Sequence, residues 1–255
     1  MSNVILETRG LTKAFNGFTA VDSVDLQVQE GHIHALIGPN GAGKSTVFNL
    51  LTHFLPATRG AVLYQGKAIG KLAPNRIARL GLVRSFQISA VFGQMSVLEN
   101  VRVALQRELG TSFHFWKAAN SLDHLNQRAM HLLEQVDLQD FALHKTAELP
   151  YGRKRALELA TTLALEPKVM LLDEPTQGMG HEDVERVVEL IRKVAVGRTV
   201  LMVEHNLRVV SSLCHRITVL ARGSVLAEGD YASVSANPQV REAYMGKEAG
   251  HVSIA

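Results

Sequence analysis

The sequence predicts an α/β protein whose central sheet is mostly parallel. A short apolar run at residues 33–37 passes through a glycine-rich loop directly into a helix, and strands alternate with helices over the last third of the chain. The strands expected there, at 169–172, 199–203 and 217–220, are apolar apart from Thr199 and Thr218 and show no apolar–polar alternation. Strands without alternation indicate a sheet that is covered on both faces, which is typical of parallel sheets.

The N-terminal region predicts a small antiparallel part. Residues 4–7 and 24–29 alternate apolar and polar side chains, as half-exposed antiparallel strands do. Turns are expected at Gly10, at Asn16-Gly17 and at Glu30-Gly31. Beyond the glycine loop we expect a strand at 61–64, a helix at 74–80 and a strand at 82–86.

The pattern changes to helices between about residue 88 and residue 160. Ser96 and Glu99 have the spacing of a capping box, which predicts that a helix begins after Ser96. Ser121 is expected to cap a second helix, and a third is expected at 152–165. In the last third, helices are expected at 182–195 and 206–213.

The loop after the strand at 33–37 has the spacing Gly-x4-Gly-Lys-Ser. Its residues are Gly38, Pro39, Asn40, Gly41, Ala42, Gly43, Lys44, Ser45 and Thr46. Glycines let successive backbone N–H groups turn toward one anion, and the following helix adds its positive end. Lys44 can reach the β- and γ-phosphates, and the Ser45 hydroxyl can ligate Mg²⁺. An ordinary glycine turn would not require Lys-Ser at this offset, so we expect a nucleoside triphosphate to bind.

Three further apolar strands end abruptly in polar groups, which are Gln87, the pair Asp173-Glu174 and the pair Glu204-His205. The ends of parallel strands share one edge, where ligands of open α/β folds bind. We expect Asp173 to hold Mg²⁺ and Glu174 to orient or deprotonate a water in line with the γ-phosphate. His205 is expected to contact the γ-phosphate and that water, and Gln87 to reach Mg²⁺ and the water. The alternative to a functional role, for any one of these residues taken alone, is a polar side chain at a solvent-exposed strand end.

The composition is that of a folded protein, with 46% hydrophobic and 20% charged residues in 255. No apolar run approaches the roughly 18–20 residues that span a bilayer. Cys214 is the only cysteine, which excludes an internal disulfide and fits a cytoplasmic setting. The basic residues are scattered, so we expect no nucleic-acid partner. The triplet Arg153-Lys154-Arg155 is interpreted as a solvated face.

Five motifs in this order and spacing resemble the ATP-binding subunit of an ABC transporter. They are residues 38–46, Gln87, residues 149–155, residues 170–175 and His205. The resemblance covers the whole chain and implies an ATPase with ATP and Mg²⁺ as cofactors. It implies one P-loop NTPase domain. The nucleotide-binding core, with a small antiparallel β subdomain, would consist of residues 1–87 and 161–255. An inserted helical subdomain would consist of residues 88–160.

The resemblance also implies a dimer in which ATP lies between one subunit's phosphate loop and the other subunit's signature segment. Tyr151, Gly152 and Arg153 would supply that contact in trans. Phe15 matches the aromatic residue that stacks on adenine, the alternative being a core phenylalanine in a turn.

The sequence departs from the general ABC pattern at two positions. Pro150 stands where the signature usually has serine, so the hydroxyl contact with the partner's γ-phosphate is lost. Gly180 stands where an aspartate is usual, which puts communication between subunits through that side chain in doubt.

Within the family, residues 149–160 and the tail at 227–246 look most like the ATPases of branched-chain amino acid importers, a branch that also serves urea and short amides. This implies permease subunits docked on the helical subdomain, with residues 88–94 as the expected surface. It also implies an identical or related second ATPase subunit, an indirect periplasmic binding protein, and a peripheral place on the cytoplasmic face of the inner membrane. Alternatives are a motor for lipid or lipopolysaccharide export, a soluble ABC ATPase, or a P-loop kinase or GTPase.

Overall fold

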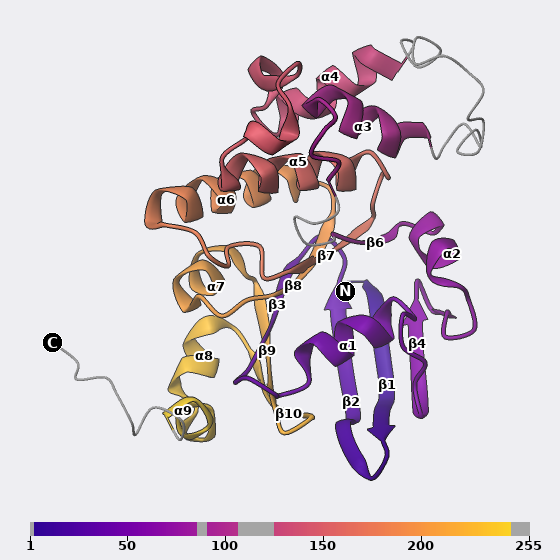
Figure 1. Cartoon of the computed structure of the whole chain (residues 1–255). Helices are drawn as coiled ribbons and strands as arrows, with labels where there is room; N and C mark the ends of the chain where they lie inside the picture. The colour runs from indigo at the N-terminus through magenta and orange to yellow at the C-terminus, as the bar shows by residue number, and fades with distance from the viewer. Residues whose placement is uncertain (1–2, 86–90, 107–124, 246–255) are drawn as a thin grey trace, which may run out of the picture.

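The larger of two sheets forms the centre of the molecule, in a computed structural model that describes residues 3–85, 91–106 and 125–245 (Figure 1). Its strand order is β10-β9-β3-β8-β7-β6. The strands are β3 (Ile33–Ile37), β6 (Leu82–Arg84), β7 (Val169–Asp173), β8 (Thr199–Val203), β9 (Arg216–Ala221) and β10 (Ser224–Gly229). Five of them run parallel, and β10 pairs antiparallel with β9. The predicted α/β class with a mostly parallel sheet is confirmed.

The smaller sheet is antiparallel, with the order β2-β1-β4-β5. Its strands are β1 (Val4–Phe15), β2 (Phe18–Gln29), β4 (Arg59–Tyr64) and β5 (Lys67–Ala68). The strands expected at 4–7 and 24–29 are the two ends of one long hairpin, which turns at Asn16-Gly17.

The prediction of a turn at Gly10 is wrong. Gly10 lies inside β1, where the pairing with β2 shifts register between Thr8 and Leu11. Its φ is 52°, and its N–H donates to Asp25 Oδ1 at 2.6 Å. A bulge that needs positive φ favours glycine as strongly as a turn does, so the residue type alone cannot separate the two.

Nine named α-helices lie within the described residues. They are α1 (Lys44–Leu51), α2 (Pro74–Arg79), α3 (Val97–Leu105), α4 (Asn126–Gln135), α5 (Tyr151–Leu163), α6 (His181–Val194), α7 (Leu207–Leu213), α8 (Tyr231–Ala236) and α9 (Pro238–Met245). Figure 1 shows α3, α4 and α5 gathered at one end of the molecule, where the helical subdomain is predicted. Because α5 runs through the boundary placed at residues 160–161, the division into subdomains stays a prediction.

Helix α3 begins with the expected capping box. The Glu99 N–H donates to Ser96 Oγ at 3.2 Å, and the Ser96 N–H donates to Glu99 Oε2 at 2.7 Å. The cap predicted at Ser121 lies outside the described residues. In the described part of the chain, no helix is both long enough and apolar enough to cross a membrane.

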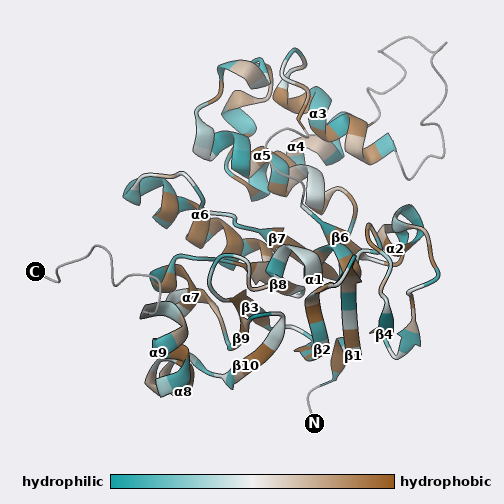
Figure 2. Cartoon of the chain, turned by 60° about the horizontal axis from the view of Figure 1, so that its bottom comes forward, coloured by the Kyte–Doolittle hydropathy of each residue, from teal (hydrophilic) through white to brown (hydrophobic). Residues whose placement is uncertain are grey.

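The larger sheet separates two hydrophobic cores. Leu36, Leu171 and Leu201 face the core that contains α1 and the antiparallel sheet. The alternate positions Ala35 and Met170 face the core formed with α3 to α9. Figure 2 shows hydrophobic residues concentrated on these central strands. Burial on both faces explains why the strands lack alternation in the sequence.

Replacing Ser96 with alanine removes the hydroxyl that accepts from the N–H of Glu99 at the start of α3. We expect Ser96→Ala to lower the free energy of unfolding by about 1 kcal/mol in urea titrations. Ser211→Ala is the matched control, because Ser211 is an exposed residue inside α7 whose hydroxyl only donates to the Arg208 carbonyl. Equal losses in the two variants would contradict a special role of the cap.

Candidate active site

The phosphate loop joins β3 to α1 and is held between two other strands. Gly38 and Gly43 have φ values of 151° and 103°, which favour glycine. A Cβ atom on Gly38 would lie 2.2 Å from the Leu220 carbonyl oxygen, and one on Gly43 would lie 2.6 Å from the Ala20 carbonyl oxygen. These approaches fix the loop against β9 and β2, so both positions require glycine.

Backbone donors converge where the loop enters α1. Of the residues that the structure describes, none accepts a hydrogen bond from the N–H groups of Gly43, Ser45 or Thr46. Lys44 is buried, and its Nζ donates to the carbonyl oxygens of Gly38 at 2.7 Å and Pro39 at 3.1 Å. Unpaired N–H groups at a helix N-terminus, beside an ammonium group, form a binding site for a phosphate anion.

Arg84 connects the candidate metal ligand Asp173 to the phosphate-loop helix. Asp173 ends β7, and its Oδ2 accepts from Arg84 Nη2 at 2.5 Å. Arg84 Nη1 donates to Asn49 Oδ1 at 2.7 Å, one turn after Ser45 on α1. Arg84 therefore ties Asp173 to the helix that carries the other expected Mg²⁺ ligand, Ser45. The sequence analysis missed Arg84, although it is the only charged residue of its strand.

Glu174 and His205 meet at the ends of β7 and β8. His205 Nε2 lies 2.6 Å from Glu174 Oε1, and with a proton on Nε2 it donates to that oxygen. The side chains of Glu174 and His205 are 20% and 41% exposed, so solvent reaches both. The carboxylate of Glu204 is buried behind them and accepts from the N–H groups of Thr176 at 3.1 Å and His205 at 2.8 Å. Glu204 thus holds together the two loops that carry the pair.

The interpretation of residues 153–155 as a solvated face is wrong for Arg155, which is only 6% exposed. Its Nη2 donates to the Asp173 carbonyl oxygen at 2.8 Å, and its Nε donates to the Pro175 carbonyl oxygen at 3.1 Å. Its Nη1 pairs with Glu158 Oε2 at 2.5 Å. Arg155 therefore attaches α5 to the segment that carries Glu174. A local charge pattern cannot reveal acceptors that belong to a distant loop.

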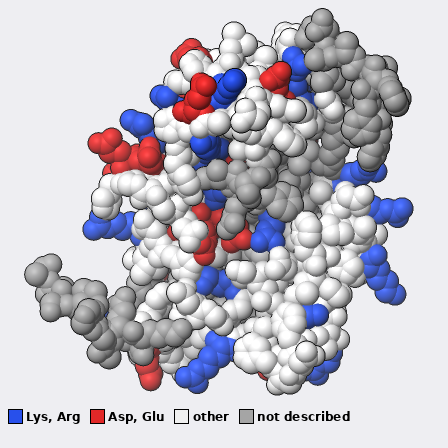
Figure 3. Space-filling view, viewed as in Figure 1, with Lys and Arg blue, Asp and Glu red and all other residues white. Residues whose placement is uncertain are grey.

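The residues expected to contact ATP in trans begin α5. The Tyr151 hydroxyl donates to the Gln177 carbonyl oxygen at 3.1 Å. The Arg153 guanidinium lies over the Phe141 ring, 3.7 Å from its centroid. Figure 3 shows basic side chains standing apart on the face drawn, so the described residues visible there form no continuous basic patch.

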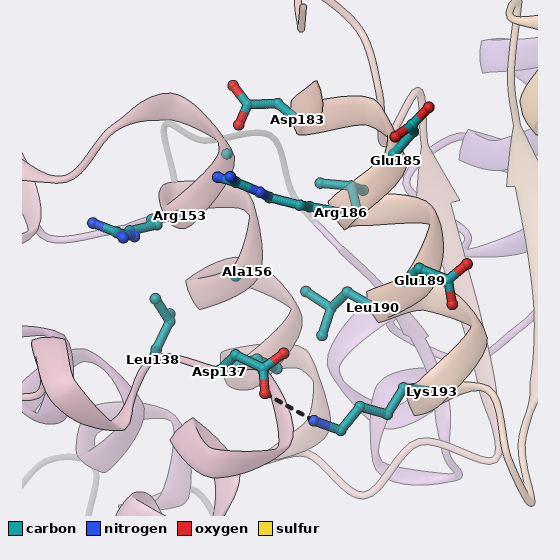
Figure 4. Close-up of a pocket in the computed structure, with 13 residues that line it drawn as sticks. Asp137, Leu138, Arg153, Ala156, Asp183, Glu185, Arg186, Glu189, Leu190 and Lys193 are labelled. Carbon is teal, nitrogen blue, oxygen red and sulfur yellow. Dashed lines mark hydrogen bonds and ion pairs between the residues drawn. The ribbon is translucent and has the colours of Figure 1, made fainter. Parts of the chain in front are cut away.

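A cavity of about 640 Å³ is lined by the first turns of α5, by α6 and by residues 136–138 (Figure 4). Its far end is closed by the ion pair between Lys193 Nζ and Asp137 Oδ1, at 3.0 Å. Arg186 reaches from α6 toward the first turn of α5. A Cβ atom on Gly152 would lie 3.0 Å from Asp183 Oδ1, so glycine lets the start of α5 approach α6 closely.

Two predicted residues are not brought to the phosphate loop by any described contact. Phe15 ends β1 and is 43% exposed, with Lys13 Nζ 5.1 Å from its ring centroid. This exposure argues against a core role, and stacking on adenine stays a prediction. Gln87 lies outside the described residues.

The family described as "ABC transporter" matches residues 21–177. This chain belongs to the ABC transporter family. The family described as "Branched-chain amino acid ATP-binding cassette transporter" matches residues 224–250, which form β10, α8 and α9 and the segment after them. The resemblance expected from the five motifs is confirmed.

Comparison with individual ABC proteins supports the same assignment. The "High-affinity branched-chain amino acid transport ATP-binding protein BraF" of Pseudomonas aeruginosa is 39% identical, over 97% of this chain and 100% of the relative. An ABC transporter cassette solved in its ADP conformation has a TM-score of 0.84 and 29% identity, covering 96% of this chain and 99% of that one. A dimeric cassette bound to ADP and Pi has a TM-score of 0.73 and 25% identity, covering 89% and 99%.

Replacing Gly38 with alanine tests the packing of the phosphate loop. The new methyl group would meet the Leu220 carbonyl oxygen, whereas a Cβ on Gly41 has nothing within 4 Å. Both glycines have positive φ, so Gly41→Ala is the matched control for backbone strain. We expect Gly38→Ala to weaken binding of a fluorescent ATP analogue about tenfold more than Gly41→Ala does. Similar affinities of the two variants would contradict the packing argument.

Burial raises the pKa of Glu158 to about 7, against an opposing contribution from Arg155. The folded chain therefore binds this proton more tightly than the unfolded chain, in which the carboxyl has its ordinary pKa of 4.5. Glu158 thus lowers the free energy of unfolding as the pH rises from 4.5 to 7. Glu158→Gln cannot titrate and should lose this slope in urea titrations. Glu166→Gln is the control, because that side chain is 71% exposed, and it should keep the wild-type slope.

Proposed function

We propose that this chain is the ATP-binding and ATP-hydrolysing subunit of an ABC importer for branched-chain amino acids. The observation that carries the hydrolytic role is the Glu174–His205 pair, which leaves the parallel sheet at the same edge as the phosphate loop. The similarity to BraF over nearly the whole chain supports the transport role. It favours import over lipid or lipopolysaccharide export and over a soluble ABC ATPase.

The loop suits a triphosphate in shape and in charge. The N–H groups of Gly43, Ser45 and Thr46 would bind phosphate oxygens, and Lys44 would add a positive charge at the β- and γ-phosphates. Ser45 and Asp173 offer the oxygen ligands that Mg²⁺ prefers. When bound, Mg²⁺ neutralises charge on the phosphates. The described residues contain no group of three or more His, Cys, Asp or Glu that could hold a metal.

Glu174 is the group we assign to the water. Its carboxylate accepts a hydrogen bond from the water and takes the proton as the water oxygen attacks the γ-phosphorus. The bond between the γ-phosphorus and the β,γ-bridging oxygen breaks, and the products are ADP and inorganic phosphate. His205 holds Glu174 Oε1 and so fixes the direction of the carboxylate. Arg155 and Glu204 fix the backbone on both sides of Glu174, so the group needs little reorganisation during the reaction.

The working unit would be a dimer with a second ATPase subunit. The related cassette that is dimeric and bound to ADP and Pi supports this arrangement. The first turn of α5 would face the partner's ATP with the N–H of Gly152 and its positive helix end, because Pro150 has no hydroxyl. Arg153 would leave the Phe141 ring to join that contact.

A permease would dock in a groove of about 570 Å³ between α2, α3 and α5. Its apolar lining includes Phe54, Pro74, Ile77, Val103, Ala104 and Leu165. Phe54 is 53% exposed at this groove. Of the surface expected at residues 88–94, the part at 88–90 lies outside the described residues. Docking there would hold the chain at the cytoplasmic face of the inner membrane, with a periplasmic binding protein acting only through the permease.

Replacing Glu174 with glutamine removes the proton acceptor and keeps the size of the side chain. We expect Glu174→Gln to reduce ATP turnover by about 100-fold or more, while ATP binding persists. The ATP-bound chain should therefore elute as a dimer in size-exclusion chromatography with ATP and Mg²⁺. Glu166→Gln makes the same chemical change at an exposed site and should turn over ATP normally. A Glu174→Gln variant with wild-type turnover would refute the assignment.

A further inference from the structure

Arg84 is held by contacts on two elements of the candidate site. Its Nη2 donates to Asp173 Oδ2 at the end of β7, and its Nη1 donates to Asn49 Oδ1 on α1. Its guanidinium carbon lies 5.7 Å from the centroid of the Phe48 ring, which is also on α1. The side chains of Arg84 and Asp173 are only 15% and 14% exposed, so solvent and salt screen their ion pair weakly. The guanidinium is therefore fixed in place.

The contact with Arg84 leaves one oxygen of Asp173 for other ligands. Arg84 occupies Oδ2, whereas none of the residues that the structure describes donates a hydrogen bond to Oδ1. A charge-assisted hydrogen bond to one oxygen of a carboxylate also fixes the direction of the second oxygen. Mg²⁺ requires a nearly ideal octahedral arrangement of oxygen ligands, so its binding depends on that direction.

The other end of Arg84 controls the helix of the second expected ligand. Asn49 lies one turn after Ser45 on α1, so a contact at Asn49 limits how far the Ser45 turn can move relative to β7. The planar guanidinium can donate to Asp173 and Asn49 at the same time because its N–H groups are spread over two nitrogens. A lysine ammonium carries the same charge at a single point and cannot span both acceptors in the same way.

We propose that Arg84 is a positioning residue for the Mg²⁺ that binds together with the nucleotide. It directs Asp173 Oδ1 and holds the spacing between Asp173 and the Ser45 turn of α1. The inference rests on the proposed function and adds to it a residue that acts on the metal only through Asp173 and α1.

The test measures the affinity for a fluorescent ATP analogue twice, once with Mg²⁺ and once with EDTA. The ratio of the two affinities is the contribution of the metal, and it requires no turnover. Arg84→Lys keeps the charge and loses the simultaneous contact with Asp173 and Asn49. Arg79→Lys is the matched control, because it makes the same change at an exposed position of α2.

We expect Arg84→Lys to reduce the ratio about tenfold, as the loss of a group that orients a metal ligand does. Its affinity in EDTA should stay within about twofold of wild type, and Arg79→Lys should keep the wild-type ratio. Asn49→Ala removes the other end of the bridge and should also reduce the ratio. The double variant should lose little more than Arg84→Lys alone, because both changes break one connection.

A wild-type ratio in Arg84→Lys would overturn the proposal. Equal losses of affinity with Mg²⁺ and with EDTA would also overturn it, because Arg84 would then act on the nucleotide or on the fold. Additive losses in the double variant would exclude the bridge through Asn49. A wild-type chain that binds the analogue equally well in both conditions has no metal contribution to position, which again overturns the proposal. A wild-type chain that binds no analogue refutes the proposed function itself, and this result is distinct from the others.

Discussion

The active site depends on the parallel register of neighbouring strands. Asp173 at the end of β7 pairs with Val203 at the end of β8, and Leu36 of β3 pairs with the same Val203. Because these strands run in step, the phosphate loop, Glu174 and His205 all leave the sheet at one edge. A slip of one residue in any pair would turn the side chains of that strand to the opposite face and into the wrong core.

Register alone does not fix the carboxylates, and two arginines, the partly buried Arg84 and the buried Arg155, complete the arrangement. Arg84 joins Asp173 to α1, and Arg155 joins the backbone around Glu174 to α5. Each guanidinium bridges elements that are far apart in the sequence, so each element is positioned by its neighbours as well as by its own fold. Removing Glu158 from its pair with the buried Arg155 would leave a charge buried without compensation, which makes that contact costly to lose.

The sequence predicted those parts of the fold whose signal is local. The strands at 33–37 and 199–203 agree with the structure to the residue, because both are short, mainly apolar runs that end abruptly, one at Gly38 and the other at Glu204. The half-exposed strand β10 and the short helices α8 and α9 carry no such pattern, and the sequence analysis missed them.

The residues of the candidate site also fall into those with a local sequence signal and those without one. The phosphate loop could be predicted from its residue spacing, and Asp173 and Glu174 from their place at the end of an apolar strand. Each of these signals lies within one short stretch of sequence. Arg84, Arg155 and Glu204 contribute through acceptors or donors on other loops, and only the folded chain brings those together.

Helix α5 has residues with three different roles along its length. Its first turn would face a partner's nucleotide, its side chain at 158 lines the groove, and its side chain at 155 holds the hydrolytic segment. A rigid helix that shifts at its first turn also moves Arg155, so a change at the start of α5 would reach the segment that carries Glu174.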